Sequence, residues 1–227
     1  MIDTNFDFFS DTPAGKDPDA HSPTLRRYHH MLWSKDLPNG EKFSLAMAKD
    51  KYLHWGTFAM SSDAISNSYR GNRKMAAIIA EVQSDADELF KVGSTIGAYI
   101  IFPSYRVDRK NTINGARGMS AKIADRFDLT LECIRRHYAG EESPLSDVFE
   151  RYGDFFELFV DLRGYVDFFL LQDLVTADYQ VNFYLPFDGF ERKGVPANPD
   201  EYRVLKEATV AFIQARTQRM LESMPAN

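Results

Sequence analysis

The sequence predicts an α+β fold in a single domain that spans residues 1–227. Apolar residues alternate with polar ones in short stretches of both halves, as in strands, and recur every three to four residues through much of the second half, as in helices. Strands and helices do not alternate regularly along the chain, so a doubly wound parallel sheet is disfavoured. Aromatic residues make up 14% of the chain, and no repeat or Pro/Gly-rich linker divides it. We therefore expect one core, with short strands packed on a largely helical second half.

The N-terminal segment is expected to be an irregular arm that covers residues 1–20. It is dense in Asp, Pro and Gly. It also carries three phenylalanines that would attach it to the body of the protein: Phe6, Phe8 and Phe9. Ser22 followed by Pro23 is typical of a helix start, because serine caps the free N–H groups and proline fits the first helical position.

The rest of the first half predicts strands around one helix. Alternating apolar residues favour a hairpin near 42–60. The spacing of apolar residues over 73–91 favours a helix. A buried strand is expected near 95–102, and Pro103 would end it.

The second half predicts mainly helices. Ser120 is expected to begin the clearest one, whose apolar stripe reaches Tyr138, and a further helix is expected over 143–159. The segment 165–175 is apolar nearly all round and predicts a central helix. Alternation near 179–187 predicts a strand, and Asn198 with Glu201 forms a capping box for a final helix.

Composition excludes several classes of protein. The net charge is −6, which argues against bulk binding of nucleic acid or of an anionic membrane. Cys133 is the one cysteine, so no disulfide within the chain is expected. The acidic N-terminus is unlike a signal peptide, and the most apolar stretch, 155–175, is too interrupted by charges to span a bilayer. A cytoplasmic location is therefore expected.

Charge is divided into two neighbouring blocks of opposite sign. Residues 105–138 carry eight basic side chains against four acidic ones, and residues 141–178 carry ten acidic side chains against two arginines. A basic block in an acidic protein either pairs with its acidic neighbour or presents itself to an anion. Pairing is expected to involve Arg126, Arg135 or Arg136 on one side, and Asp147, Glu150 or Asp154 on the other.

The basic block contains a candidate anion site. Arg117 lies between two glycines and just before the expected helix start, where free N–H groups and the helix dipole favour an anion. The candidate ligand-binding residues are Arg106, Arg109, Lys110, Asn114, Arg117 and Ser120. In the alternative interpretation Arg117 pairs with an Asp of the acidic block. The segment is neither a Walker A loop nor a dinucleotide-binding fingerprint.

A polar cleft is the second candidate site, formed by Arg163, Asp167 and Asp173. The two aspartates lie in an otherwise apolar segment, where a buried carboxylate needs solvent, a partner or a ligand. Arg163 precedes Asp167 by four residues, so a structural ion pair is the alternative. A further acidic stripe on the 143–159 helix, from Glu150 to Asp161, is interpreted as a solvated face.

The histidines and the cysteine give no catalytic or metal site. The five histidines lack metal-ligand spacing, and no metal site is predicted. His29 is interpreted as a satisfied residue at the edge of the core. Cys133 and His137 lie one helical turn apart, but a buried thiol in mid-helix is expected to be inert.

Several segments resemble a bacterial family of unknown function. They include Asp17–His29, Thr112–Gly118, Lys122–Tyr138, Gly164–Val175 and Leu185–Asp188, so the resemblance covers nearly the whole chain. It implies one full-length domain. No activity, cofactor or catalytic residue follows from it.

The sequence thus favours a protein that binds an anion, namely a nucleotide or the phosphates of a nucleic acid. One alternative is a phosphoester hydrolase or nuclease that uses Asp167 or Asp173 with a divalent metal. Another is a non-catalytic interaction module whose two charge blocks mate between subunits of a homo-oligomer. The sequence identifies no cofactor, and it does not decide whether the protein is an enzyme.

Overall fold

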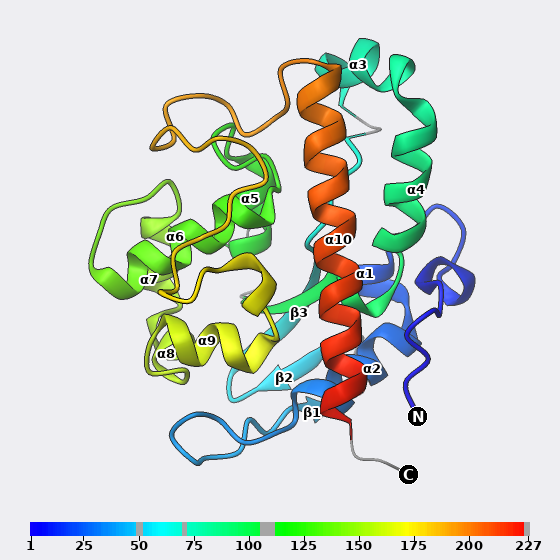
Figure 1. Cartoon of the computed structure of the whole chain (residues 1–227). Coiled ribbons are helices and arrows are strands. Elements are labelled where there is room, and N and C mark those ends of the chain that lie inside the picture. Colours follow the sequence, from blue (N-terminus) through cyan, green and yellow to red (C-terminus); the bar gives the residue numbers. More distant parts are fainter. Residues whose placement is uncertain (49–51, 70–71, 105–111, 225–227) are drawn as a thin grey trace.

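A four-stranded antiparallel sheet lies at one end of the computed structural model, which describes residues 1–48, 52–69, 72–104 and 112–224 (Figure 1). Its strands follow chain order: β1 (Ala46–Met47), β2 (Leu53–Trp55), β3 (Phe58–Ala64) and β4 (Tyr99–Ser104). The second half of the described chain is helical, so the α+β prediction is confirmed.

The predicted hairpin is present, but its second strand turns back on itself. The segment expected to form one strand up to Met60 instead makes β2 and β3, joined by Gly56 and Thr57. Gly56 has φ +54°, a left-handed conformation that glycine adopts without strain. In β4, Pro103 pairs with Met60 rather than ending the strand, which an edge strand tolerates.

Short helices replace part of the irregular arm. They are η1 (Phe8–Asp11) and α1 (Pro18–His21), and α2 (Pro23–Trp33) follows. The predicted cap of α2 is confirmed, because Ser22 Oγ accepts a hydrogen bond from the Leu25 N–H at 3.0 Å. Phe8 is buried and packs edge-on against the rings of Tyr28 and Tyr99. The arm is thus attached to the body, as expected.

The helix expected over 73–91 is broken into pieces: η2 (Arg73–Met75), α3 (Ala76–Glu81) and α4 (Gln83–Gly93). The break falls at Val82, whose φ of −121° and ψ of 34° are not helical. A turn of 3-10 helix, η3 (Ile96–Ala98), then leads into β4. The predicted strand therefore begins four residues later than the sequence indicated.

The described chain from residue 112 onward continues with α5 (Ile113–Met119), α6 (Phe127–Ala139), α7 (Ser146–Arg151), α8 (Gly153–Glu157) and α9 (Leu162–Phe169). The helix predicted over 143–159 is interrupted at Tyr152. The central helix predicted over 165–175 is shorter and ends at Leu170, which is left-handed with φ +57°.

The strand predicted near 179–187 is not formed. This segment contributes an isolated bridge between Val175 and Val181. One of its backbone N–H groups bonds a side chain of α6 and not a neighbouring strand. The Tyr184 N–H donates to Asp128 Oδ2 at 3.0 Å, and the rings of Phe183 and Phe187 stack with centroids 4.2 Å apart. The alternation of apolar residues over 179–187 therefore reflects side-chain packing along an irregular segment, which we name the irregular strap.

The long helix α10 (Pro199–Ser223) runs along the molecule, with α4 on one side and α5 to α9 on the other (Figure 1). It follows η5 (Gln172–Leu174) and the irregular strap. Asn198 Oδ1 accepts a hydrogen bond from the Glu201 N–H at 2.9 Å, which confirms the predicted cap.

One cluster of buried apolar side chains extends from Ile2 to Met220. It includes residues of the sheet, of α2 and of α10. A core shared in this way favours the predicted single domain, which stays a prediction. Arg216 of α10 is buried in it and donates to the carbonyls of Gly97, Tyr99 and Phe169. Within the described ranges, no helix combines the length and the apolar character needed to cross a bilayer.

Candidate functional site

Arg117, the centre of the predicted anion site, lies in the interior. Its side chain is 0% exposed. The guanidinium donates to the Asp63 carboxylate, to Thr130 Oγ1 at 2.8 Å and to the Asp125 carbonyl at 3.2 Å. Its partner Asp63 belongs to β3 and not to residues 141–178. The alternative prediction, that Arg117 pairs with an Asp of the acidic block, is therefore also wrong. An anion could reach this guanidinium only by displacing those acceptors.

Ser120 does not begin a helix, which removes the expected N–H groups from this site. It caps the C-terminus of α5, and α6 starts at Phe127. Between them Ala124 and Asp125 have φ of 48° and 59°, a left-handed conformation that cannot continue a right-handed helix.

Of the other predicted anion ligands, Arg106, Arg109 and Lys110 lie outside the described residues. Asn114 sits on α5 one turn before Arg117. Its Nδ2 donates to Ser61 Oγ at 3.1 Å and to the Ser62 carbonyl at 2.9 Å. Asn114 therefore joins α5 to β3.

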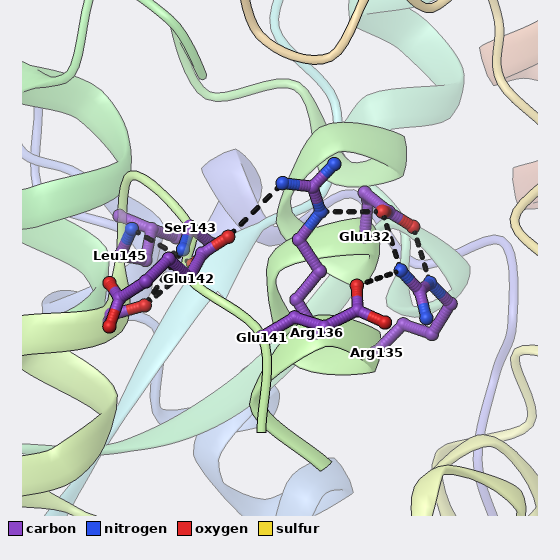
Figure 2. A network of polar contacts seen from close by, with 8 residues as sticks. Glu132, Arg135, Arg136, Glu141, Glu142, Ser143 and Leu145 are labelled. Atoms are coloured by element: carbon purple, nitrogen blue, oxygen red, sulfur yellow. Dashed lines mark hydrogen bonds and ion pairs between the residues drawn. The ribbon is translucent and has the colours of Figure 1, made fainter. Parts of the chain in front are cut away.

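The basic block pairs with acids, but with nearer ones than expected. Arg135 and Arg136 both donate to the carboxylate of Glu132 on their own helix, and Arg135 also reaches Glu141 at 2.7 Å (Figure 2). Arg136 continues to the Glu142 carbonyl at 3.1 Å, and Arg126 pairs with Asp128. The predicted partners Asp147, Glu150 and Asp154 are thus replaced by acidic residues within six positions of each arginine.

The predicted polar cleft is only partly assembled. Arg163 and Asp167 form the expected i,i+4 pair at 3.8 Å and line a cavity of about 540 Å³ beside α9. Lys35 lines the same cavity, and burial lowers the pKa of its ammonium to about 8. Asp173 is not part of that cavity lining and makes a bidentate pair with Arg219 of α10 instead.

A different set of carboxylates surrounds Arg117. Asp63 comes from β3, Asp125 from the connection between α5 and α6, and Asp19 from α1, which packs against β3. Asp19 is half-buried, its Oδ1 has no contact with solvent, and no hydrogen-bond partner for that atom is found among the described residues. Asn67 Nδ2 donates to Asp125 Oδ2 at 3.3 Å. We name Asp17, Asp19, Asp63 and Asp125 the aspartate cluster.

Burial and the charges of neighbouring carboxylates raise the pKa of two members of this cluster, Asp19 and Asp63. Loss of solvent raises the pKa of Asp19 well above its ordinary value, and the charges of Asp63, Asp17 and Asp125 raise it further, against the opposing effect of Arg117. For Asp63, burial raises the pKa to about 6, although the Arg117 guanidinium acts to lower it. The side chain of Asp63 is 16% exposed, so the cluster reaches the surface.

Strained backbone accompanies the cluster. Tyr69 has φ +56°, and its hydroxyl donates at 3.1 Å to the carbonyl of left-handed Ala124. Asp125 is left-handed as well. Each such residue costs on the order of 1 kcal/mol or more, and strain of this kind gathers at functional sites.

Two cavities meet at Asn67. One holds about 200 Å³ and is lined by Asp17 and Asp19, among others. The other holds about 570 Å³ and is lined by Tyr69 and Asp125. Three aspartates of the cluster, Asp17, Asp19 and Asp125, therefore line the two cavities that share Asn67.

Sequence reasoning missed this site. Asp19 precedes the predicted helix start, in a stretch that indicates a turn, and the carboxylate partner of Arg117, Asp63, lies 54 positions away in the chain. The one usable signal is that Asp19, Arg117 and Asp125 all belong to segments that carry the family resemblance.

Metal binding has no preformed centre in the parts of the chain that the structure describes. There, no three side chains of His, Cys, Asp or Glu are arranged to hold a metal ion. His29 is satisfied, as expected: its Nδ1 accepts from Trp33 Nε1 at 2.9 Å and its Nε2 lies 2.9 Å from Ser62 Oγ. Burial raises the pKa of the Cys133 thiol to about 12, in agreement with an inert cysteine.

Comparison with known proteins identifies the family. A family model described as "Family of unknown function (DUF6994)" matches residues 2–220, so the chain belongs to that family. The resemblance over nearly the full length is thereby confirmed. Neither a curated protein nor a solved structure matches the chain.

Proposed function

We propose that this member of the family binds a small polar ligand beside the aspartate cluster and acts on it by acid–base chemistry. The observation that carries the proposal is Asp19, a residue that lines a cavity and whose buried Oδ1 has no hydrogen-bond partner among the described residues. A buried polar atom of this kind costs free energy, so a ligand that donates a hydrogen bond to it is favoured.

The cluster has the two protonation states that acid–base catalysis uses. Asp19 retains its proton to a higher pH than an ordinary aspartate, and Asp63 changes its charge near pH 6. Close carboxyl groups cannot all ionise, so one can donate a proton while another accepts one. A carboxyl group with a shifted pKa that lines a cavity, as Asp19 does, is a frequent property of active sites.

The charge of the cluster selects against phosphates. The Arg117 guanidinium is already paired with Asp63, and Asp17, Asp63 and Asp125 repel negative charge at Asp19, so a phosphate there would meet the same repulsion. A phosphate-bearing ligand or a nucleic acid, which the sequence favours, would depend on Arg106, Arg109 and Lys110 outside the described residues. No contact among the described residues favours that second function.

A metal-dependent hydrolase and an interaction module receive less support from the contacts. The hydrolase would use Asp167 or Asp173, but each already pairs with an arginine: Asp167 with Arg163, and Asp173 with Arg219. Mating of charge blocks between subunits would need free arginines, but Arg135 and Arg136 pair within the chain (Figure 2). A bacterial origin, a cytoplasmic location and a homo-oligomer remain proposals.

Esterification by a diazo reagent tests whether Asp19 is an accessible acid. A protonated carboxyl group transfers its proton to the diazo carbon, nitrogen gas leaves, and the carboxylate oxygen bonds to that carbon as an ester. With a small diazoacetamide at pH 7, we expect Asp19 to be esterified at least ~10-fold faster than exposed Asp178, as measured by peptide mass spectrometry. Equal labelling of both aspartates, or none at Asp19, would overturn the proposal.

A further inference from the structure

An aromatic wall faces the aspartate cluster across the smaller cavity. Phe9 of η1 and Phe90 of α4 line it and are 40% and 44% exposed. Their rings stack with centroids 5.2 Å apart and an angle of 30° between the planes. Tyr99 of β4 is buried and completes the wall. Two large exposed aromatic rings at a cavity are typical of ligand recognition.

The polar side of the same cavity carries negative charge. Asp17 is exposed and Asp19 is half-buried, and both line the cavity. Ser66, Asn67 and Ser68 supply neutral polar groups. Among the described residues, no lysine or arginine contributes to this lining. A ligand here meets carboxyl groups on one side and aromatic rings on the other.

The size of the cavity limits its occupant to a small group. Its volume of about 200 Å³ is below the roughly 300–1,000 Å³ of typical pockets for drug-sized ligands. This space suits the head group of an amine and is too small for a whole nucleotide.

From this combination we infer that the ligand carries an alkylammonium group, which the cavity holds between Phe9, Phe90 and the carboxyl groups of Asp17 and Asp19. This inference rests on the proposed function and names its class of ligand. The positive charge is attracted by the ring faces as well as by the carboxylates, and the alkyl groups pack against the rings. A hydroxyl or N–H of the ligand can donate to the unpartnered Asp19 Oδ1.

Binding of a cation should also release a proton from the cluster. Asp19 is surrounded by Asp17 of its own segment, Asp63 of β3, Asp125 before α6 and Arg117 of α5. An added positive charge favours the ionised form of Asp19, and therefore the ligand should bind more tightly as the pH rises. A neutral ligand of the same shape gives neither effect.

Choline and its uncharged isostere, 3,3-dimethyl-1-butanol, separate charge from shape. Isothermal titration of the full chain at pH 7.5, in two buffers with different heats of ionisation, should show choline bound at least ~10-fold more tightly, with release of protons. Phe90→Ala should weaken choline about 3- to 10-fold. Leu221→Ala, an equally exposed apolar residue of α10, should leave the affinity unchanged.

Each outcome decides the inference. If choline binds no better than the alcohol, or if Phe90→Ala has no effect in a variant with normal circular dichroism, the alkylammonium class is wrong. Esterification of Asp19 would then still support the proposed function with another ligand. If Asp19 is not esterified either, both proposals fall.

Discussion

Replacement of Arg117 by alanine is expected to lower the free energy of unfolding by about 3–5 kcal/mol at pH 7.5. The substitution leaves Asp63 without its cationic partner beside Asp19 and Asp125, and it removes the hydrogen bonds to Thr130 and to the Asp125 carbonyl. Urea denaturation followed by circular dichroism measures the loss.

Two further variants separate the lost ion pair from other effects. Arg163→Ala removes an exposed arginine whose pair with Asp167 is 3.8 Å long, and should change stability by less than ~0.5 kcal/mol. Asp63→Asn in the Arg117→Ala background should recover part of the loss, because it removes the unpaired charge. If Arg117→Ala is as stable as the parent, Arg117 is not structural and the anion site regains support.

Replacement of Asp19 by asparagine is expected to raise stability at neutral pH, by about 0.5–2 kcal/mol. The folded chain keeps Asp19 protonated to a higher pH than the unfolded chain does, because burial and neighbouring aspartates raise its pKa. Folding therefore takes up a proton, and the stability that Asp19 contributes is lost as the pH rises from about 4 through its folded pKa. Asparagine keeps the shape without this loss.

The sign of the pH dependence identifies the effect. The gain from Asp19→Asn should be small at pH 4 and grow with pH. Asp63→Asn breaks the pair with Arg117 and should lower stability, by an amount that shrinks as the pH rises and becomes constant above about pH 6. Asp178→Asn, at an exposed position, should give no such trend. A loss of stability that is constant between pH 4 and 8 would mean that Asp19 acts through packing or hydrogen bonding alone.

Local signals explain the parts of the fold that the sequence predicted well. Ser22 and Asn198 cap α2 and α10 as expected, because each bonds an N–H group only three residues away. The pair of Arg163 with Asp167 was predicted from helical spacing for the same reason. Such contacts need no knowledge of the tertiary structure.

Distant contacts explain the errors. The helix predicted from Ser120 starts at Phe127, because Ala124 and Asp125 are left-handed in a loop that Tyr69 contacts from 55 positions away. Tyr184 bonds Asp128 instead of a neighbouring strand. Alternation of apolar residues cannot tell these arrangements from a regular element.

The site was only half predictable. Arg117 was singled out as an anion ligand and not as the buried partner of Asp63, which is 54 positions away, and nothing in the spacing of either residue connects them. Asp19 gave no signal because a carboxylate before a helix is usually a solvated cap. Only folding brings together the three segments that carry Asp19, Asp63 and Arg117.

A carbon-13 NMR titration of the aspartate carboxyl groups tests the central claim most directly. Asp19→Asn and Asp63→Asn assign the two signals in the parent protein. We predict that Asp63 titrates with a midpoint near 6 and that Asp19 retains its proton well above pH 4. If both signals titrate near pH 4, as ordinary aspartates do, the cluster holds no proton at neutral pH and the acid–base account is wrong.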